Sequence, residues 1–438
     1  MHHPPPRRAR IRAVRLVSIS LLIAAALAAQ PAADPKERIR AVRELAKQSV
    51  EGIPGIAAYV QDPVVEVRVE VVKRLNDIGG PRTLDALVRL TSDADPEVQI
   101  NAIDGLVNIF VPGYLKSGIA RTTTRSGDAL KVKFNEPGDL VVDGYVNVTP
   151  EAITAATNVL SKSKSLEARA NAARALGIFR ARSAVPQLSE ALYSKDDQLM
   201  YESLVAMQKI RDPAAGASLA FLVRDLNEKV QTAALRASGI LRAKQAAPGI
   251  RTVIDDNPSP RILREAGDAL AMIADPVDRG VFLRFLGQRD PALRGAAAEG
   301  LARIKNPADA ERLTQAFNDE REFGPRLSMA FALVSLGRME INDLSPFRYL
   351  INGLNRATFR AVALAFLTEL SRESAARLTI YPNLARATKD EKTGICQVLA
   401  ESGQQDSVPY LNGLKDDNDP EVAQTCLRSL RTLEARLR

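Results

Sequence analysis

The chain has 438 residues, of which 26% are charged and 46% hydrophobic, and it contains only two cysteines. This length exceeds what one globular core usually holds, and two cysteines exclude a disulfide-stapled fold. The formal net charge is +8, but five arginines and no acidic residue lie within residues 1–28, so the rest carries only +3. Nucleic-acid binding requires a concentrated basic surface, and we therefore expect no nucleic-acid partner.

The N-terminus has the pattern of an export signal. Arginines within residues 7–15 precede an apolar run at 16–29, and residues 26–28 (ALA) supply a small-residue cleavage site. The apolar run is shorter than the roughly 20 residues of a membrane-spanning helix. We predict a Sec-type signal peptide at 1–28, cleavage near Ala28, and a periplasmic or secreted bacterial protein without stable membrane insertion. An uncleaved anchor and a twin-arginine signal are the alternatives.

From residue 29 onward the sequence repeats a unit of two short amphipathic helices, most clearly at 288–318. Asp290-Pro291 is typical of a helix start, with a carboxylate cap before proline at the first helical position. Apolar residues from Leu293 to Leu301 recur at helical spacing, and a second helix is expected over 308–317. Neither helix is long enough to be stable alone, so each must pack on a neighbouring pair.

Equivalent first-helix positions recur with a nearly constant period, at steps of 31 to 34 residues from residue 169 to the C-terminus. Three residues after that position, mostly small side chains recur: Ala41, Val71, Ala102, Ala172, Ser203, Ala234, Ala266, Ala297, Met329, Ala363, Ile395 and Cys426. Such a period, with small and large apolar positions in register, is the signature of a solenoid. We predict an all-α superhelix of about twelve helical pairs, with repeats over 29–110 and 149–438.

The period breaks at 111–148, within the third repeat. Apolar residues alternate with lysines at 130–134, and the turn-forming stretch 135–139 separates them from residues 140–148. This pattern predicts a β-hairpin. Long insertions in repeat arrays are often functional, so we expect a partner contact here; a hairpin that only packs on the repeats is the alternative. The residues of the predicted contact are Thr122, Thr123, Thr124, Arg125, Lys131 and Lys133.

These repeats resemble HEAT repeats, in particular the short HEAT-like repeats of the phycobilin-lyase type. The resemblance is carried by the stretches DPVVEVRVEVVKRL (62–75), DPEVQINAIDGL (95–106), LEARANAARALGIF (166–179), DPALRGAAAEGLARI (290–304) and DPEVAQTCLRSL (419–430). It covers nearly all of the chain from Asp34 and implies a helical solenoid with a binding surface. It also implies, as an alternative function, a lyase-like or enzyme-accessory subunit.

Catalytic motifs are missing from the sequence. The only histidines, His2 and His3, lie inside the predicted signal peptide, which leaves no histidine for a general base, an activated nucleophile or a metal ligand. The sequence has neither a phosphate-binding glycine loop nor a nucleophile elbow. We therefore predict that the protein is not an enzyme and has no cofactor or metal.

Two further residue groups have structural explanations. Cys396 and Cys426 lie in first helices of adjacent repeats, which pack about 8–10 Å apart, beyond the roughly 7 Å that a disulfide allows between Cα atoms. We expect buried small residues there, with a bridge as the alternative. Aspartates recur in the turns, including the cluster at 416–419, which lacks the spacing of a calcium loop; helix capping explains them.

Arginines recur at one register of the first helices. They could form a basic stripe for an acidic partner, but we expect an inter-repeat ladder in which each arginine pairs with a turn carboxylate. The six arginines are Arg38, Arg68, Arg169, Arg294, Arg326 and Arg360.

Ten of the twenty Phe and Tyr residues fall between 282 and 381. They could line a groove, but we expect most to replace leucine in the core.

The sequence favours a non-enzymatic, monomeric scaffold that binds a protein partner on its concave face and insertion. We expect the second helices to form that concave face. Binding of an anionic polymer through the arginine rows is a further alternative.

Overall fold

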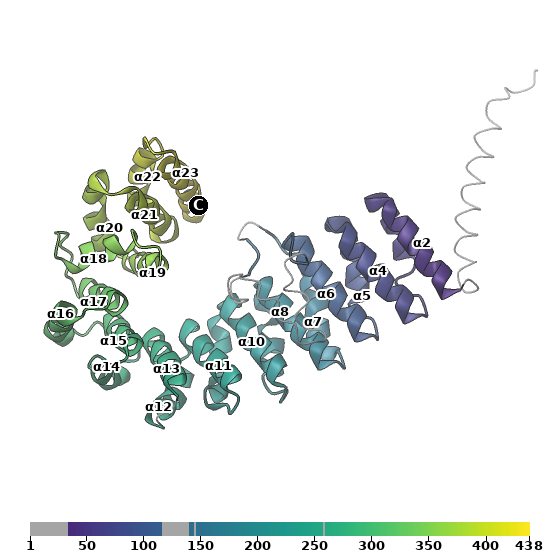
Figure 1. Ribbon diagram of the computed structural model, residues 1–438, viewed down its shortest axis with the longest axis horizontal. Helices are drawn as coiled ribbons and strands as arrows, with labels where there is room; N and C mark the ends of the chain where they lie inside the picture. Colours follow the sequence, from purple (N-terminus) through teal and green to yellow (C-terminus); the bar gives the residue numbers. More distant parts are fainter. Residues whose placement is uncertain (1–33, 116–139, 144–145, 257–258) are drawn as a thin grey trace, which may run out of the picture. The chain divides into compact units, whose positions relative to one another are not determined.

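A computed structural model describes residues 34–115, 140–143, 146–256 and 259–438, and all regular secondary structure in these residues is helical (Figure 1). The chain divides into two compact units at Ile210/Arg211, called unit 1 and unit 2. Within each unit, successive first helices pack side by side, and most second helices pack on the first helix of the next repeat. The predicted all-α solenoid is therefore confirmed.

The described part of unit 1 contains five first helices, which pack in chain order. They are α2 (Pro35–Lys47), α4 (Val65–Ile78), α6 (Pro96–Phe110), α8 (Leu166–Ile178) and α10 (Asp197–Ile210). The second helices of this unit are α3 (Ile53–Ala57), α5 (Leu84–Leu90), α7 (Pro150–Lys162) and α9 (Val185–Ala191).

Among the residues that the structure describes, unit 2 has seven first helices. They are α11 (Glu228–Ile240), α13 (Pro260–Ile273), α15 (Pro291–Ile304), α17 (Phe323–Ser335), α19 (Arg360–Leu370), α21 (Lys389–Ser402) and α23 (Pro420–Leu437). Its second helices are α12 (Ala247–Asp255), α14 (Arg279–Phe285), α16 (Ala310–Asp319), α18 (Pro346–Gly353), α20 (Ser374–Ile380) and α22 (Val408–Leu414). The segment before α11 has only the 3-10 turns η5 (Pro213–Gly216) and η6 (Ala220–Arg224).

Many first helices begin where a turn residue caps the backbone. The Asp95 carboxylate accepts hydrogen bonds from the Glu97 and Val98 amides, and the Asp290 carboxylate accepts one from Ala292 at 2.9 Å. The following proline fits because its missing N–H has no partner in the first turn. Most second helices begin with a 3-10 turn, such as η9 (Pro307–Asp309) before α16.

The core of each unit lies where neighbouring first helices meet. Every residue of the small-residue register is buried except Ala41, which is half-buried. Gly300 on α15 shows how tight this packing is, because a Cβ added there would lie 2.5 Å from the buried ring of Phe282. No described helix combines the length and apolar character needed to cross a membrane.

The predicted β-hairpin is wrong for its described part, because residues 140–143 and 146–148 form no strand. The other predicted strand, at 130–134, lies outside the described residues. The Val142 amide donates a 2.9 Å hydrogen bond to the Ile178 carbonyl at the end of α8, and the Val142 and Val148 side chains are buried. The segment thus satisfies backbone groups at a helix end instead of in a strand ladder.

The expectation of unpaired cysteines is also wrong. Cys396 on α21 and Cys426 on α23 form a disulfide with Cα atoms 5.2 Å apart, and both side chains are buried. The distance of about 8–10 Å between packed helices refers to their axes. Each Cα lies about 2.3 Å from its axis, so two small residues that face each other at the crossing can be bridged.

Candidate functional site

Unit 1 contains a groove of about 1380 Å³ along one side of α6, here called the α6 groove. One wall is the end of α4 with the Gly79-Gly80-Pro81 turn, and the floor is the face of α6 from Pro96 to Ile109. Pro112, Gly113 and Leu115 close one end, and Glu167 at the start of α8 adds to the lining. The groove therefore follows the first helices of three successive repeats.

Close contact between α4 and α6 forms the floor. The Asn76 side-chain amide donates a 2.9 Å hydrogen bond to the Asn101 carbonyl. Its Oδ1 atom is buried and has no hydrogen-bond partner among the described residues. Gly105 makes room for this side chain, since a Cβ there would lie 2.0 Å from Asn76 Oδ1. The floor is therefore held by a polar side chain fitted against a glycine.

Deeper in the groove, Asp104 is only 3% exposed. Its Oδ1 accepts hydrogen bonds from Asn171 Nδ2 at 3.2 Å and from the Tyr114 hydroxyl at 3.4 Å. Burial raises the pKa of Asp104 to about 7, against the opposing effects of the Asn171 hydrogen bond and of Arg174. Arg174 itself binds Glu202 at 2.7 Å. The cluster joins α6, α8 and α10 to the start of the 111–148 insertion through Tyr114.

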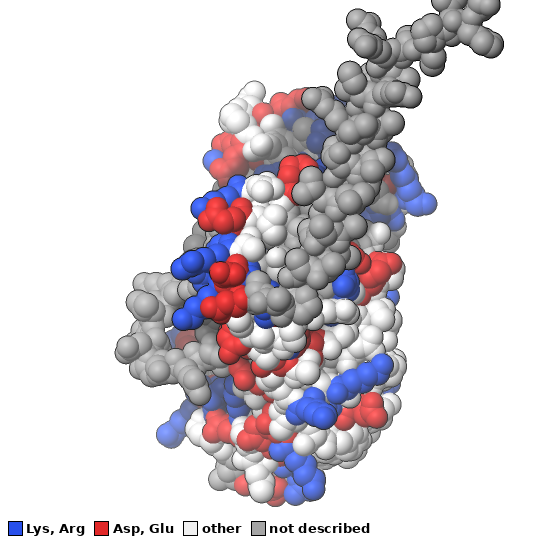
Figure 2. Space-filling model, turned by 90° about the vertical axis from the view of Figure 1, so that its right-hand side faces the viewer, with Lys and Arg blue, Asp and Glu red and all other residues white. Residues whose placement is uncertain are grey.

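The rim of the groove carries charges of both signs. Lys73 lies 3.5 Å from Glu97, and Arg74 binds Asp77 at 2.7 Å. Figure 2 likewise shows Lys and Arg side chains beside Asp and Glu side chains on the face that it presents. Mixed charge around a partly apolar floor suits a polypeptide segment better than a uniform polyanion.

The predicted contact residues of the insertion, Thr122 to Arg125, Lys131 and Lys133, lie outside the described residues. The described ends of the insertion are anchored on the repeats: Tyr114 is 2% exposed, and the Leu115 amide donates to Asn108 Oδ1 at 3.2 Å. Pro112, Gly113 and Leu115, which precede the undescribed residues, thus lie at the margin of the α6 groove. The predicted partner contact stays a prediction.

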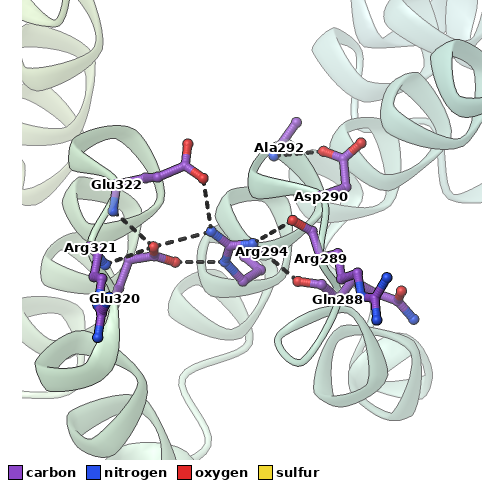
Figure 3. A network of polar contacts seen from close by, with 8 residues as sticks. All are labelled: Gln288, Arg289, Asp290, Ala292, Arg294, Glu320, Arg321 and Glu322. Carbon is purple, nitrogen blue, oxygen red and sulfur yellow. Dashed lines mark hydrogen bonds and ion pairs between the residues drawn. The ribbon is translucent and has the colours of Figure 1, made fainter.

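Three arginines of the predicted ladder bind carboxylates in the following turn. Arg38 binds Asp62 at 2.8 Å, and Arg68 binds Asp93. Figure 3 shows the same arrangement at Arg294, whose Nε donates to Glu320 at 2.6 Å while its Nη1 donates to the Gln288 and Arg289 carbonyls. Each arginine thus links a first helix to the turn that follows, and Arg68 and Arg294 also bind carbonyls of the preceding turn.

The other three arginines have different partners. Arg169 donates to the Leu160 carbonyl at 2.7 Å. Arg360 donates to the Leu354 carbonyl and to Thr393, and lies 3.5 Å from the Asp390 carboxylate. Arg326 lies over two aromatic rings.

Further ion-pair rows were missed by the sequence analysis. In unit 2, Arg251 of α12 binds the buried Asp278, and Arg279 of α14 binds the buried Asp309 at 3.0 Å. A repeated signal was available, because both aspartates occupy the third position of a Pro-x-Asp turn that precedes a second helix. A row also joins the first helices, with the pairs Arg43–Glu70, Arg174–Glu202 and Arg236–Glu265.

The first helices line the inner side of unit 2. The prediction that the second helices form this face is therefore wrong. Two ion pairs between first helices two repeats apart lead to this conclusion. Arg303 on α15 binds Glu369 on α19 at 3.0 Å, and Lys305 binds Glu373. Alternate helices of a flat stack would lie about 16–20 Å apart. Direct contact therefore requires the first-helix face to close inward, and Figure 1 shows α12, α14 and α16 on the opposite side.

Stacked helical pairs with register-specific links between repeats define an α-solenoid. The family model described as HEAT repeats matches residues 19–107 and 153–237. HEAT repeats are therefore present in these two regions, as predicted.

Several solved structures are similar to the chain at low identity. An engineered protein is 19% identical, with 87% of this chain and 98% of that chain covered and a TM-score of 0.37. The complex of CpcE and CpcF of phycocyanin lyase from Nostoc sp. PCC7120 is 20% identical (64% and 94% covered, TM-score 0.36). Human deoxyhypusine hydroxylase in complex with glycerol is 20% identical (65% and 96% covered, TM-score 0.24). No curated protein matches the chain.

Proposed function

We propose that the protein is a non-enzymatic, exported scaffold that holds a segment of a partner protein in the α6 groove. The observation that carries this proposal is the groove itself, whose volume of about 1380 Å³ exceeds the roughly 300–1,000 Å³ of small-molecule sites. A polypeptide segment in extended or helical form matches a channel of this size that follows three repeats.

The lining supports a polypeptide ligand. The floor combines Ile100 with the polar side chains of Asn101 and Asn108, and the rim offers carboxylates and cations. Such a surface can satisfy the backbone and mixed side chains of a bound segment. Asp104 already accepts hydrogen bonds from Asn171 and Tyr114, which suits a structural role better than proton transfer.

Export is supported by two independent features. Residues 1–28 have the pattern of a signal peptide, and the Cys396–Cys426 disulfide is of a kind that persists in oxidising compartments. The polyanion alternative has less support, because Arg38, Arg68 and Arg294 already bind carboxylates.

In-cell photo-crosslinking tests the proposal. A photoreactive residue at Asn101 in the groove should give a discrete protein adduct, whereas the same residue at Glu190, exposed on α9 of the same unit, should not. A blocking Glu97→Lys change should reduce the Asn101 adduct. Equal adducts at both positions, or none at Asn101, would overturn the proposal.

A further inference from the structure

Unit 2 carries a surface cluster in which arginines stack on aromatic rings, around the ends of α16 and α18 and the starts of α17 and α19. The aromatic–arginine cluster consists of Phe317, Phe323, Arg326, Tyr349, Arg356 and Phe359. None of its contacts belongs to the α6 groove, which lies in unit 1.

Arg326 is the exception in the first-helix arginine register. Its guanidinium carbon lies 4.6 Å from the ring centre of Phe317 and 5.1 Å from that of Tyr349. Among the described residues it has no side-chain hydrogen bond or ion pair, and its Nε is buried without a partner. Arg294 one repeat earlier has a turn carboxylate in the corresponding place. The turn after α18, at 355–358 (NRAT), offers no acidic residue to Arg326.

Arg356 adds a second cation that is exposed. Its guanidinium carbon lies 4.3 Å from the ring centre of Phe323, and within the described ranges its side chain has no ion pair. Stacking on a ring holds the guanidinium plane but leaves its edge N–H groups available for an oxyanion. Two guanidinium groups are thus preoriented without a carboxylate partner.

The rings form a continuous, partly exposed platform. Phe323 lies 4.9 Å from Tyr349 and 4.7 Å from Phe359 between ring centres, and all three are half-buried. Phe317, which is buried, supports Tyr349 edge-on at 5.6 Å. A ligand can therefore place an apolar group on the rings while its acidic group meets the arginines.

The arginines of the cluster form no ion pair with the described acidic residues nearby. Glu320 and Glu322 are both engaged by Arg294, at 2.6 and 3.5 Å, and among the described residues the exposed Asp319 at the end of α16 forms no ion pair with Arg326 or Arg356. Burial raises the pKa of Tyr349, Arg326 and Arg356 both act against that rise, and Glu320 adds to it, which places both cations and the Glu320 carboxylate near this ring. An incoming carboxylate would meet two cations that form no ion pair among the described residues.

We propose that the aromatic–arginine cluster binds an acidic segment of a partner protein, with an Asp or Glu carboxylate on the edges of Arg326 and Arg356 and a neighbouring apolar side chain on Phe323 and Phe359. The inference rests on the proposed function only in taking the ligand to be a protein. Sugar rings also stack on aromatic side chains, so an acidic polysaccharide is the competing occupant, and the heparin competition below tests it.

Fluorescence anisotropy on the oxidised full-length chain tests the proposal. The probe is a labelled twelve-residue peptide that alternates Glu or Asp with Phe and Leu, and the reference peptide carries Gln and Asn in place of the acids. We expect the acidic peptide to bind and the amide peptide to bind about tenfold more weakly or not at all. Arg356→Gln should weaken acidic-peptide binding about tenfold, whereas Arg321→Gln, a change at an exposed neighbouring arginine that does not stack, should not.

Arg356→Lys and a competitor complete the test. Lysine keeps the charge but lacks the planar edge, so it should restore only part of the affinity. Equal binding by wild type and Arg356→Gln, or displacement of the peptide by heparin but not by unlabelled peptide, would overturn the proposal. Glu97→Lys in the α6 groove should leave peptide binding unchanged. Absence of an Asn101 adduct in the protein with an unaltered groove, together with retained peptide binding, would contradict only the proposed function.

Discussion

Arg303 Nη2 lies 3.0 Å from Glu369 Oε2, although the two residues belong to first helices two repeats apart. Arg303 also lies over the ring of Phe331, 5.4 Å from its centre, and Phe331 stacks on Phe366 of α19 at 4.5 Å. Glu299 binds the same guanidinium at 3.3 Å. One arginine therefore links α15, α17 and α19 on their inner side.

Arg303→Ala should lower the free energy of unfolding by about 2–4 kcal/mol, because it leaves Glu299 and Glu369 without their shared cation in a mostly buried place. Urea denaturation at pH 7 measures the change. Arg289→Ala removes an exposed side chain and should be nearly neutral. Equal effects of the two changes would contradict the role given to Arg303.

Gly300→Ala should destabilise unit 2 by about 1–3 kcal/mol, because the added methyl group would meet the buried Phe282 ring at 2.5 Å and the core must shift. Gly280→Ala on α14 is the matched control. Nothing lies within 4 Å of a Cβ at Gly280, so alanine there should stabilise by up to about 1 kcal/mol. Thermal unfolding of the two variants should thus shift in opposite directions; a stabilised Gly300→Ala would show that the packing is looser than described.

Removing the disulfide should loosen the C-terminal pair of first helices. The bridge closes a sequence separation of 30 residues, and loss of such a bridge typically costs about 2–4 kcal/mol. Cys396→Ser with Cys426→Ser should therefore raise hydrogen exchange in α21 and α23 more than in α11 or α13. Alkylation of the denatured, unreduced protein at either cysteine would show that no bridge forms.

Stability should depend on pH through Asp104. Its pKa is about 7 in the folded protein, raised from 3.8 by burial, while the unfolded chain keeps the ordinary value. The folded state thus binds more protons between these values, so the free energy of unfolding falls as pH rises from about 4 to about 7. The loss is at most about 4 kcal/mol, in a site that also contains Tyr114, Arg174 and Glu202.

Asp104→Asn keeps the shape but removes the titrating group, so it should be more stable than wild type at pH 8 and lose that advantage near pH 4. Denaturant midpoints across this range measure the difference. A constant difference between the two proteins at all pH values would exclude Asp104 as the titrating group.

The helical repeat could be predicted from the sequence because its causes are local. Asp290 before proline starts a helix wherever it occurs, and residues such as Ala297 and Leu301 must face a neighbour at helical spacing. The contacts of Arg38 and Arg68 follow from the same register. By contrast, the Arg303–Glu369 pair depends on the curvature of the array. This curvature cannot be predicted from any short stretch of the sequence.

The candidate sites could not be predicted from the sequence, because they too depend on contacts between residues of different repeats. The α6 groove depends on the fit of Asn76 against Gly105 and on the place where the chain leaves α6 at Tyr114. The aromatic residues have two roles. Phe282, Phe331 and Phe347 are fully buried in the core, whereas Phe323, Tyr349 and Phe359 are half-buried in the aromatic–arginine cluster. The pattern at 140–148 predicted a strand, but the Val142 amide donates its hydrogen bond to the Ile178 carbonyl at the end of α8.

The most direct test is hydrogen exchange of the full chain with and without the protein captured at Asn101. The proposed function predicts that the partner slows exchange at the end of α4 and along α6, on both sides of the groove, and leaves α9 unchanged. Protection elsewhere in the chain, with unchanged exchange in α4 and α6, would contradict it.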